Sequence, residues 1–389
     1  MTVDNLTPYS ISSNDILTTI YDITRAVFRH LPIRSLDSCT LVCQSWADLA
    51  RRLKSQRSCI QTFAYQTDSF LSQNFNESIS PFIHDKLWSI PSFALVVVTR
   101  NLDERGFASQ SSSSSVTKSS RRSKAQQTAR HTEHIDTSQV LTHHLNRSCR
   151  IFTIVSSGII VTNDSNQSKE IETTDGLGMI LFPKFPSNIF QIYPFSIPAN
   201  CKISPNMSRS DLHQLLGGIP DDVPIRCVLF FVVNRQSQVL KCMQNLVKNY
   251  PSKLVIAGGF VEQVEQSKNT CGIVLTGDEN HLNIRQIVLE SHLQTIEQIN
   301  SKLTKLKSNE DSSKFSFAIQ LSCVARGEDF YGNENVECTQ FRNLFPRTPL
   351  IGIFGNGEIG HDYLSNESIQ SADDLFLTYS TVFTLISIN

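Results

Sequence analysis

Residues 315–360 constrain the fold of this chain more than any other stretch, because they combine two strand patterns with one helical pattern. Apolar runs of strand length cover 315–325 and 349–354, and each one ends in a small polar turn. The amphipathic segment 335–345 between them has helical spacing, so we expect a strand, a crossover helix and a second, parallel strand. Both polar turns would then follow strand carboxyl ends, the usual mouth of a ligand crevice in an open α/β sheet.

The residues of these turns form the first candidate site. The predicted crevice residues are Cys323, Arg326, Gly327, Gly355, Asn356, Gly357 and Glu358. Arg326 and Glu358 are expected to pair, either as a structural clamp or as a site that recognises a ligand or peptide terminus. The glycines are expected to adopt backbone conformations that a side chain would obstruct. A nearby Arg326 would lower the pKa of Cys323 if that thiol faced the crevice.

An Arg-Gly after one strand, followed by a Gly-Glu-Ile turn after the next, resembles the FIST C-terminal domain. That domain is a sensory and ligand-binding type of module. The resemblance implies an α/β domain near the C-terminus whose crevice lies at the two turns.

Composition limits the classes of function. With 389 residues, of which 40% are hydrophobic, the chain can bury a sizeable core, and we expect two or three domains. A formal net charge of −1 gives no overall attraction to nucleic acid or to a membrane surface. No apolar run has the length of a membrane span, and no signal-peptide core is present, which favours an intracellular protein.

The cysteines and glycines argue against metal and nucleotide sites. Ten scattered cysteines contain no C-x-x-C pair, so we expect neither a zinc site nor a disulfide framework. No G-x-G-x-x-G or P-loop pattern follows a strand, so no cofactor is expected.

The N-terminal segment 14–54 carries a different pattern, typical of two amphipathic helices. The first helical stripe is Ile16, Ile20, Ile23, Val27 and Leu31, with Ser13 or Asn14 as the expected N-cap. Pro32 ends it, and a single second helix, capped by Ser35, is expected to carry Cys39, Val42, Cys43, Trp46, Leu49, Ala50 and Leu53. A unit this small cannot hide both apolar faces, so a surface should remain for another protein.

In their order and spacing these residues resemble an F-box, although Leu17-Thr18 stands where the family usually has its first Leu-Pro. The resemblance implies binding of the Skp adaptor. The implied adaptor-binding residues are Ile20, Ile23, Val27, Phe28, Leu31, Pro32, Leu36, Val42, Cys43 and Trp46. The alternative is a helical hairpin packed on the following domain.

The rest of the chain alternates strand and helix patterns. Strands are expected at 91–100, 150–155, 159–162, 227–234, 254–257 and 271–276, a hairpin-like pair at 171–182, and a strand or helix-to-strand segment at 375–388. Helices are expected at 138–145, 239–249 and 289–306. Between them lies a serine-rich loop whose basic cluster, Lys118, Arg121, Arg122, Lys124 and Arg130, fits an import signal, a phosphate-binding patch or an ordinary solvated loop.

These patterns predict an α+β protein: a small N-terminal helical unit, then an α/β region of mixed sheets flanked by helices. By the two resemblances, the helical unit would be an F-box and the α/β region would be FIST-type. The expected division is a flexible N-terminus (1–12), the F-box (13–60), the start of the FIST-type N-terminal region (61–102), the loop (103–138), the rest of that region (139–235) and the FIST C-terminal domain (236–389).

The order F-box then FIST implies the substrate receptor of a Skp–cullin–F-box ubiquitin ligase. The F-box would dock the Skp adaptor, the cullin and RING subunit would bring the conjugating enzyme, and the FIST region would present a target protein for proteasomal degradation. The chain itself would not be an enzyme, and it would act in the cytoplasm and the nucleus. A membrane partner is not expected, and a nucleic acid partner is not favoured.

Two alternatives from other classes stay open. One is a small-molecule sensor without a role in ubiquitination. The other is a cysteine-dependent hydrolase using Cys323, His361 and Asp362, which requires an exposed Cys323 within hydrogen-bond reach of His361.

Overall fold

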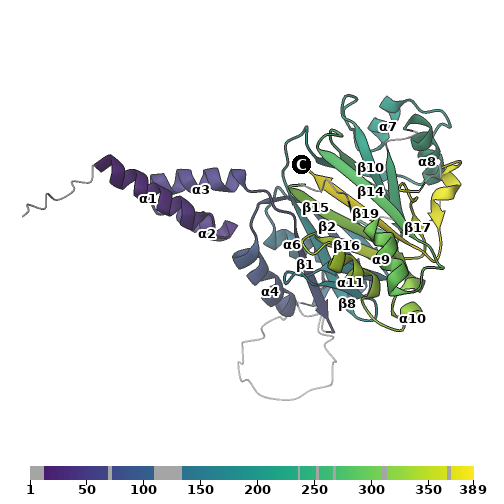
Figure 1. Ribbon diagram of the computed structural model, residues 1–389, viewed down its shortest axis with the longest axis horizontal. Helices are drawn as coiled ribbons and strands as arrows, with labels where there is room; N and C mark the ends of the chain where they lie inside the picture. Colours follow the sequence, from purple (N-terminus) through teal and green to yellow (C-terminus); the bar gives the residue numbers. More distant parts are fainter. Residues whose placement is uncertain are drawn as a thin grey trace, which may run out of the picture.

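The computed structural model describes residues 13–68, 72–108, 134–234, 237–250, 254–265, 269–307, 313–365 and 369–389. A small helical unit at the N-terminus projects from a larger body of sheets and helices (Figure 1). No helix of these ranges is both long and apolar enough to cross a membrane. The basic cluster at 118–130 lies outside the described residues, as does most of the loop around it.

Three helices build the N-terminal unit: α1 (Ser13–Phe28), α2 (Ile33–Cys39) and α3 (Gln44–Gln56). The prediction of a single second helix is wrong, because the chain turns at residues 40–43. There the Thr40 hydroxyl donates to the Asp37 carbonyl, and the amides of Leu41 and Val42 bond only three residues back. Pro32, not Ser35, is the N-cap of α2. The expected cap of α1 falls on side chains outside the described part.

Three sheets make up the body. The first has the order β1 (Gln61–Thr67), β8 (Asp175–Pro183), β2 (Pro91–Thr99), β5 (Arg150–Ser156) and β12 (Gln263–Val264). The second has the order β18 (Phe376–Leu377), β17 (Glu358–Ile359), β11 (Val255–Phe260), β10 (Ile225–Val232), β13 (Thr270–Thr276) and β9 (Gln191–Ile197). The third has the order β14 (Leu282–Leu289), β19 (Thr381–Ile388), β15 (Phe315–Cys323), β16 (Leu350–Gly355), β6 (Gly158–Thr162) and β7 (Ser168–Ile171).

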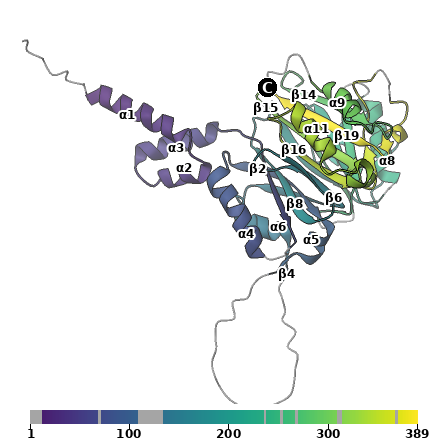
Figure 2. The same cartoon turned by 60° about the horizontal axis from the view of Figure 1, so that its bottom comes forward.

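Helices cover the outer face of each sheet, while the inner faces share one apolar core (Figure 2). The first sheet carries α4 (Ser72–Pro81), α5 (Arg100–Arg105) and α6 (Thr137–His144), the second α7 (Arg209–Leu215) and α8 (Ser237–Asn249), and the third α9 (Ile296–Thr304) and α11 (Val336–Leu344). Alternation along β2 shows why its sequence is apolar throughout: Leu95 and Val97 face the shared core, and Val96 faces the helices. The predicted α+β class with mixed, helix-flanked sheets is confirmed.

The β–α–β unit at 315–360 is also confirmed. β15 and β16 pair in parallel, with Cys323 opposite Gly355, and α11 connects them. Short elements occur in the connections: η2 (Val324–Arg326) and α10 (Glu328–Tyr331) follow β15 directly.

Several element predictions are wrong. Residues 171–182 form no hairpin, because β7 pairs with β6 in the third sheet whereas β8 pairs with β1 and β2 in the first. The helix expected at 289–306 begins only at Ile296, after a Thr295 capping box, and Leu289 completes β14. The ends of the loop at 103–138 contain the last turn of α5 and the strand pair β3 (Phe107–Ala108) and β4 (His134–Ile135). Several elements were not predicted at all, among them β1, α4, β9, α7 and β14.

The boundary expected between residues 235 and 236 falls between β10 and β11, which pair in one sheet. Strands β6 and β7 likewise join strands from the C-terminal part. Both halves of the body therefore share the second and third sheets.

Candidate functional site

An apolar patch is exposed on the N-terminal helical unit. Its members are the large side chains Ile20, Tyr21, Ile23, Val27, Leu41 and Val42, and Leu41 is 87% exposed. Four come from α1 and two from the turn between α2 and α3. Cys43, next to Val42, is also exposed. A patch of this kind on so small a unit marks an interaction surface.

Five of the predicted adaptor-binding residues lie at this surface: Ile20, Ile23, Val27, Val42 and Cys43. Phe28 and Leu36 do not, because both are buried with Leu49, Ala50 and Leu53 in the core of the helical unit. Trp46 is half-buried and packs edge-on against Phe28, with ring centroids 5.0 Å apart. Leu31 and Pro32 are half-buried as well. The residues Phe28, Leu36 and Trp46 therefore hold the helices together.

Two members of the patch, Tyr21 and Leu41, were not among the predicted adaptor-binding residues. In the single second helix that was predicted, Leu41 would have lain on the polar face. The turn at residues 40–43 turns it outward. The Asp37-Ser38-Cys39-Thr40 run, whose Thr40 side chain bonds the backbone, was the available signal for this break.

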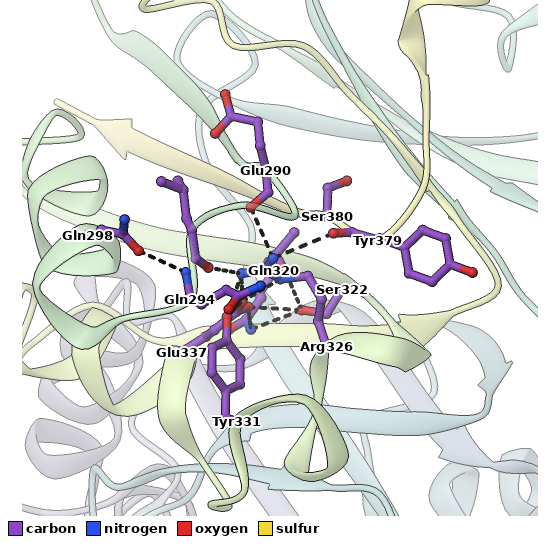
Figure 3. Close-up of polar contacts among 12 residues, drawn as sticks. Glu290, Gln294, Gln298, Gln320, Ser322, Arg326, Tyr331, Glu337, Tyr379 and Ser380 are labelled. Atoms are coloured by element: carbon purple, nitrogen blue, oxygen red, sulfur yellow. Dashed lines mark hydrogen bonds and ion pairs between the residues drawn. The ribbon is translucent and has the colours of Figure 1, made fainter.

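Arg326, the first charged residue of the predicted crevice, is buried and does not line a crevice. This residue is only 1% exposed, and its Nε donates to Glu337 at 2.9 Å. Nη1 and Nη2 donate to the carbonyls of Glu290 and Leu293, both at 3.1 Å, and the guanidinium also bonds the Tyr331 hydroxyl (Figure 3). The prediction of an Arg326–Glu358 pair is wrong, because η2 turns the arginine toward α10 and α11.

Glu337 is the centre of the same buried network. Its carboxylate accepts from Arg326, from the Tyr331 hydroxyl at 2.6 Å and from the Gln320 amide at 3.2 Å (Figure 3). The Phe330 ring packs on the guanidinium 4.9 Å away. Since these contacts occupy the donors of Arg326, the arginine is a structural clamp between β15, α10 and α11.

Glu358 lies in a separate buried group. Its carboxylate accepts from the Ser380 hydroxyl at 2.7 Å, and burial raises the pKa of Glu358 to about 7. Burial, with the neighbouring Glu358, also raises the pKa of Cys323. The prediction of a lowered Cys323 pKa is therefore wrong.

The hydrolase alternative loses its physical basis in this geometry. A nucleophilic cysteine needs a lowered pKa and access to solvent, whereas Cys323 is buried beside a carboxyl group. Asp362 forms an ion pair with Lys302 at 2.7 Å, and Lys302 also bonds Glu290. Cys323 is therefore a thiol packed in the interior of the body.

Each of the three glycines of the predicted site is required for a different structural reason. Gly357 has φ = 128°, which favours glycine. At Gly355 a Cβ would lie 2.5 Å from the Phe260 carbonyl oxygen. At Gly327 a Cβ would overlap the Glu172 carboxylate, which accepts from the Glu328 amide at the start of α10.

A crevice of about 660 Å³ does open at the carboxyl ends of β10, β11 and β16. It is lined by Val233, Asn234, Phe260, Val261, Glu262, Asn356, Gly357, Phe376, Leu377 and Thr378. Of the predicted crevice residues, Asn356 and Gly357 line it, whereas Cys323, Arg326, Gly327, Gly355 and Glu358 are buried. The expected position at strand ends is thus occupied by a largely different set of side chains.

Comparison with known proteins identifies the class. The F-box domain model matches residues 21–58, which contain the exposed patch and the core of the helical unit. Residues 21–58 therefore match an F-box domain, and an F-box implies binding of a Skp-type adaptor.

Relatives extend the similarity beyond the F-box. "F-box only protein 22" of Homo sapiens is 25% identical over 398 residues, covering 96% of this chain and 94% of that protein. The protein of the same name from Pongo abelii is 25% identical over 399 residues, with the same coverage. An F-box/LRR-repeat protein of Arabidopsis thaliana is 31% identical over 121 residues, or 29% of this chain and 22% of its own. Among solved structures, a hydrolase from A. caulinodans covers 86% of this chain and 100% of its own at 7% identity and a TM-score of 0.36, which is too low to support an argument.

Proposed function

We propose that this chain is the substrate receptor of a Skp–cullin–F-box ubiquitin ligase. The observation that carries the proposal is the exposed patch of Ile20, Tyr21, Ile23, Val27, Leu41 and Val42 within the F-box match. Leaving such side chains in water costs about 25 cal/mol for each Å² of apolar surface, and a partner that covers them recovers that free energy. The helical unit projects from the body, so an adaptor can reach the patch (Figure 1).

In this function the body binds the target protein and catalyses nothing itself. The 660 Å³ crevice is the candidate place for a segment of the target. The rings of Phe260 and Phe376, 6.0 Å apart, offer apolar contact, while Asn234 and Asn356 offer amide hydrogen bonds. Ubiquitination of the bound target would lead to its proteasomal degradation.

The adaptor surface is tested by replacing Leu41 and Val42 together with aspartate. A buried apolar anchor at an interface contributes about 2 kcal/mol or more, so we expect at least a roughly thirtyfold loss of affinity for a purified Skp adaptor by calorimetry. Leu364→Asp is the matched control, because Leu364 is an exposed apolar residue of the body. Unchanged adaptor binding in the double variant would refute the proposal and favour the small-molecule sensor.

The target site is tested with Asn234→Arg, which fills the crevice from an exposed position. We expect proteins that co-purify with the wild-type chain and accumulate on its deletion to be lost from this variant. Asn283→Arg, at an exposed position of β14, is the control. Retention of every such protein by Asn234→Arg would place the target site elsewhere on the body.

A further inference from the structure

Arg57 connects the F-box to the body. It is the C-cap of α3, and its guanidinium reaches the carboxyl end of α1, where it donates to the carbonyls of Phe28, at 2.7 Å, and Arg29, at 3.0 Å. A third bond goes to the Leu31 carbonyl. The same guanidinium lies over the ring of Trp88, 5.0 Å from its centroid.

These contacts suit arginine in particular. The last carbonyls of α1 have no partner within the helix, and they form the negative end of the helix dipole. A planar guanidinium can bond several carbonyls through its edge while its face stacks on an aromatic ring, and an ammonium group cannot do both.

Trp88 is itself fixed to the body. Its amide donates to the Gln61 side chain at 2.7 Å, and Gln61 donates to the Lys86 carbonyl at 2.8 Å. Ser89 donates to the Cys59 carbonyl at 2.9 Å. Arg57 therefore joins the end of α1 to the start of the first sheet.

A second attachment lies at α2. The Ile33 amide donates to the Leu87 carbonyl at 2.8 Å, and the Ile33 side chain is buried with Phe82, Ile83 and Leu87 of the body. Beside it, a cavity of about 340 Å³ separates α2 from the body. The contacts around Ile33 hold α2 against the body on one side of this cavity, and the contacts of Arg57 hold the end of α1 as a second attachment, so the two together fix the angle of the F-box.

We propose that Arg57 is a positioning residue of the ligase: with Trp88 it holds the F-box at one angle to the body. This inference rests on the proposed function. A target bound to the body would then stand at a fixed place relative to the conjugating enzyme, and a fixed geometry raises the effective concentration of the reacting groups.

The junction can be measured directly, because the chain has two tryptophans and they lie in different places. Trp46 packs inside the F-box and Trp88 at the junction. With 5-fluorotryptophan incorporated, Arg57→Ala should shift or broaden the Trp88 fluorine resonance and leave the Trp46 resonance unchanged. Spin labels at the exposed positions Arg25 and Glu297 should show a broader distance distribution in the variant. Arg51→Ala, which removes an exposed arginine of α3 paired with Asp48, should change neither measurement.

The functional test uses the full chain with purified adaptor, cullin, RING subunit and conjugating enzyme, and maps ubiquitin on the chain's own lysines by mass spectrometry. We expect Arg57→Ala to bind the adaptor within about twofold of wild type, since Arg57 lies outside the exposed patch. Ubiquitination of the lysines preferred in the wild type should fall about threefold or more in Arg57→Ala, and ubiquitin should appear on other lysines. The reason is that these lysines are no longer held at a fixed place relative to the conjugating enzyme.

The outcomes separate the two proposals. An equally broad wild-type distance distribution, or an unchanged lysine pattern in Arg57→Ala, would overturn the positioning role while the proposed function stands. Failure of the wild-type chain to bind the adaptor would overturn the proposed function and the ligase role of Arg57 together. Arg57→Lys should lie between wild type and alanine in each measurement.

Discussion

Replacing Arg326 with alanine should destabilise the body severely. Arg326 and Glu337 are 1% and 2% exposed, so the substitution leaves a carboxylate buried without its cation. Breaking a buried pair in this way costs about 3–5 kcal/mol of the free energy of unfolding. The carbonyls of Glu290 and Leu293 lose a donor as well. Since a native domain has about 5–15 kcal/mol in total, about a fifth or more of its stability would be lost.

The assay is urea denaturation followed by circular dichroism, with hydrogen exchange in α11 as a local measure. Tryptophan fluorescence is unsuitable, because Trp46 and Trp88 lie in the F-box and at the junction. Arg100→Ala is the matched control: it breaks an ion pair with Glu104 whose side chains are 62% and 58% exposed, so the free energy of unfolding should hardly change.

A loss of less than about 1 kcal/mol in Arg326→Ala, the value of an ordinary hydrogen bond, would show that the Arg326–Glu337 pair does not hold the body together. A variant that keeps its stability but no longer supports ubiquitination of a target would instead identify Arg326 as a recognition residue.

Three further predictions follow from individual contacts. Since burial raises the pKa of Glu358 from 4.5 to about 7, the folded chain binds that proton more tightly than the unfolded chain. The stability that this proton contributes is fully present below pH 4.5 and should be lost as the pH rises through 7. Glu358→Gln should flatten this part of a stability–pH curve measured in urea. Gly327→Ala should cost only about 1 kcal/mol in the same assay, because Glu172 can swing away and loses one capping bond; a loss above about 3 kcal/mol would contradict this account. Trp46→Ala should destabilise the F-box by about 2 kcal/mol or more and speed hydrogen exchange in α1 and α3, whereas Val42→Ala should weaken adaptor binding without that effect.

Local periodicity predicted much of the fold. The β15–α11–β16 unit, the doubly buried β2 and helices α6 and α8 all depend on spacing within about 10–15 residues, and spacing is visible in one sequence. Pairing partners are not visible in this way. Turn residues near Gly176 favoured a hairpin at 171–182, but β8 pairs with β1 and β2, which lie about 80 residues or more earlier in the chain.

The site was harder to predict for the same reason. Arg326 was identified, but its true partner, Glu337, looks like an ordinary polar residue of an amphipathic helix. Only the tertiary structure brings Glu290, Leu293 and Glu337 around one guanidinium. A strand-end position was thus predictable, whereas which of its charged residues turn inward was not.

The F-box shows a further limit of periodicity. A helical stripe defines which residues share a face, but Phe28 is buried while Val27 is exposed. Because α2 and α3 are short, they cover only part of the apolar surface of α1, and the division between core and partner surface depends on where α2 ends. Thr40 sets that end through its bond to Asp37, and so leaves Leu41 and Val42 exposed on the same small unit as Ile23 and Val27. The break in the second helix, which sequence spacing concealed, therefore adds Leu41 and Val42 to the exposed side chains of α1 on which the proposed function depends.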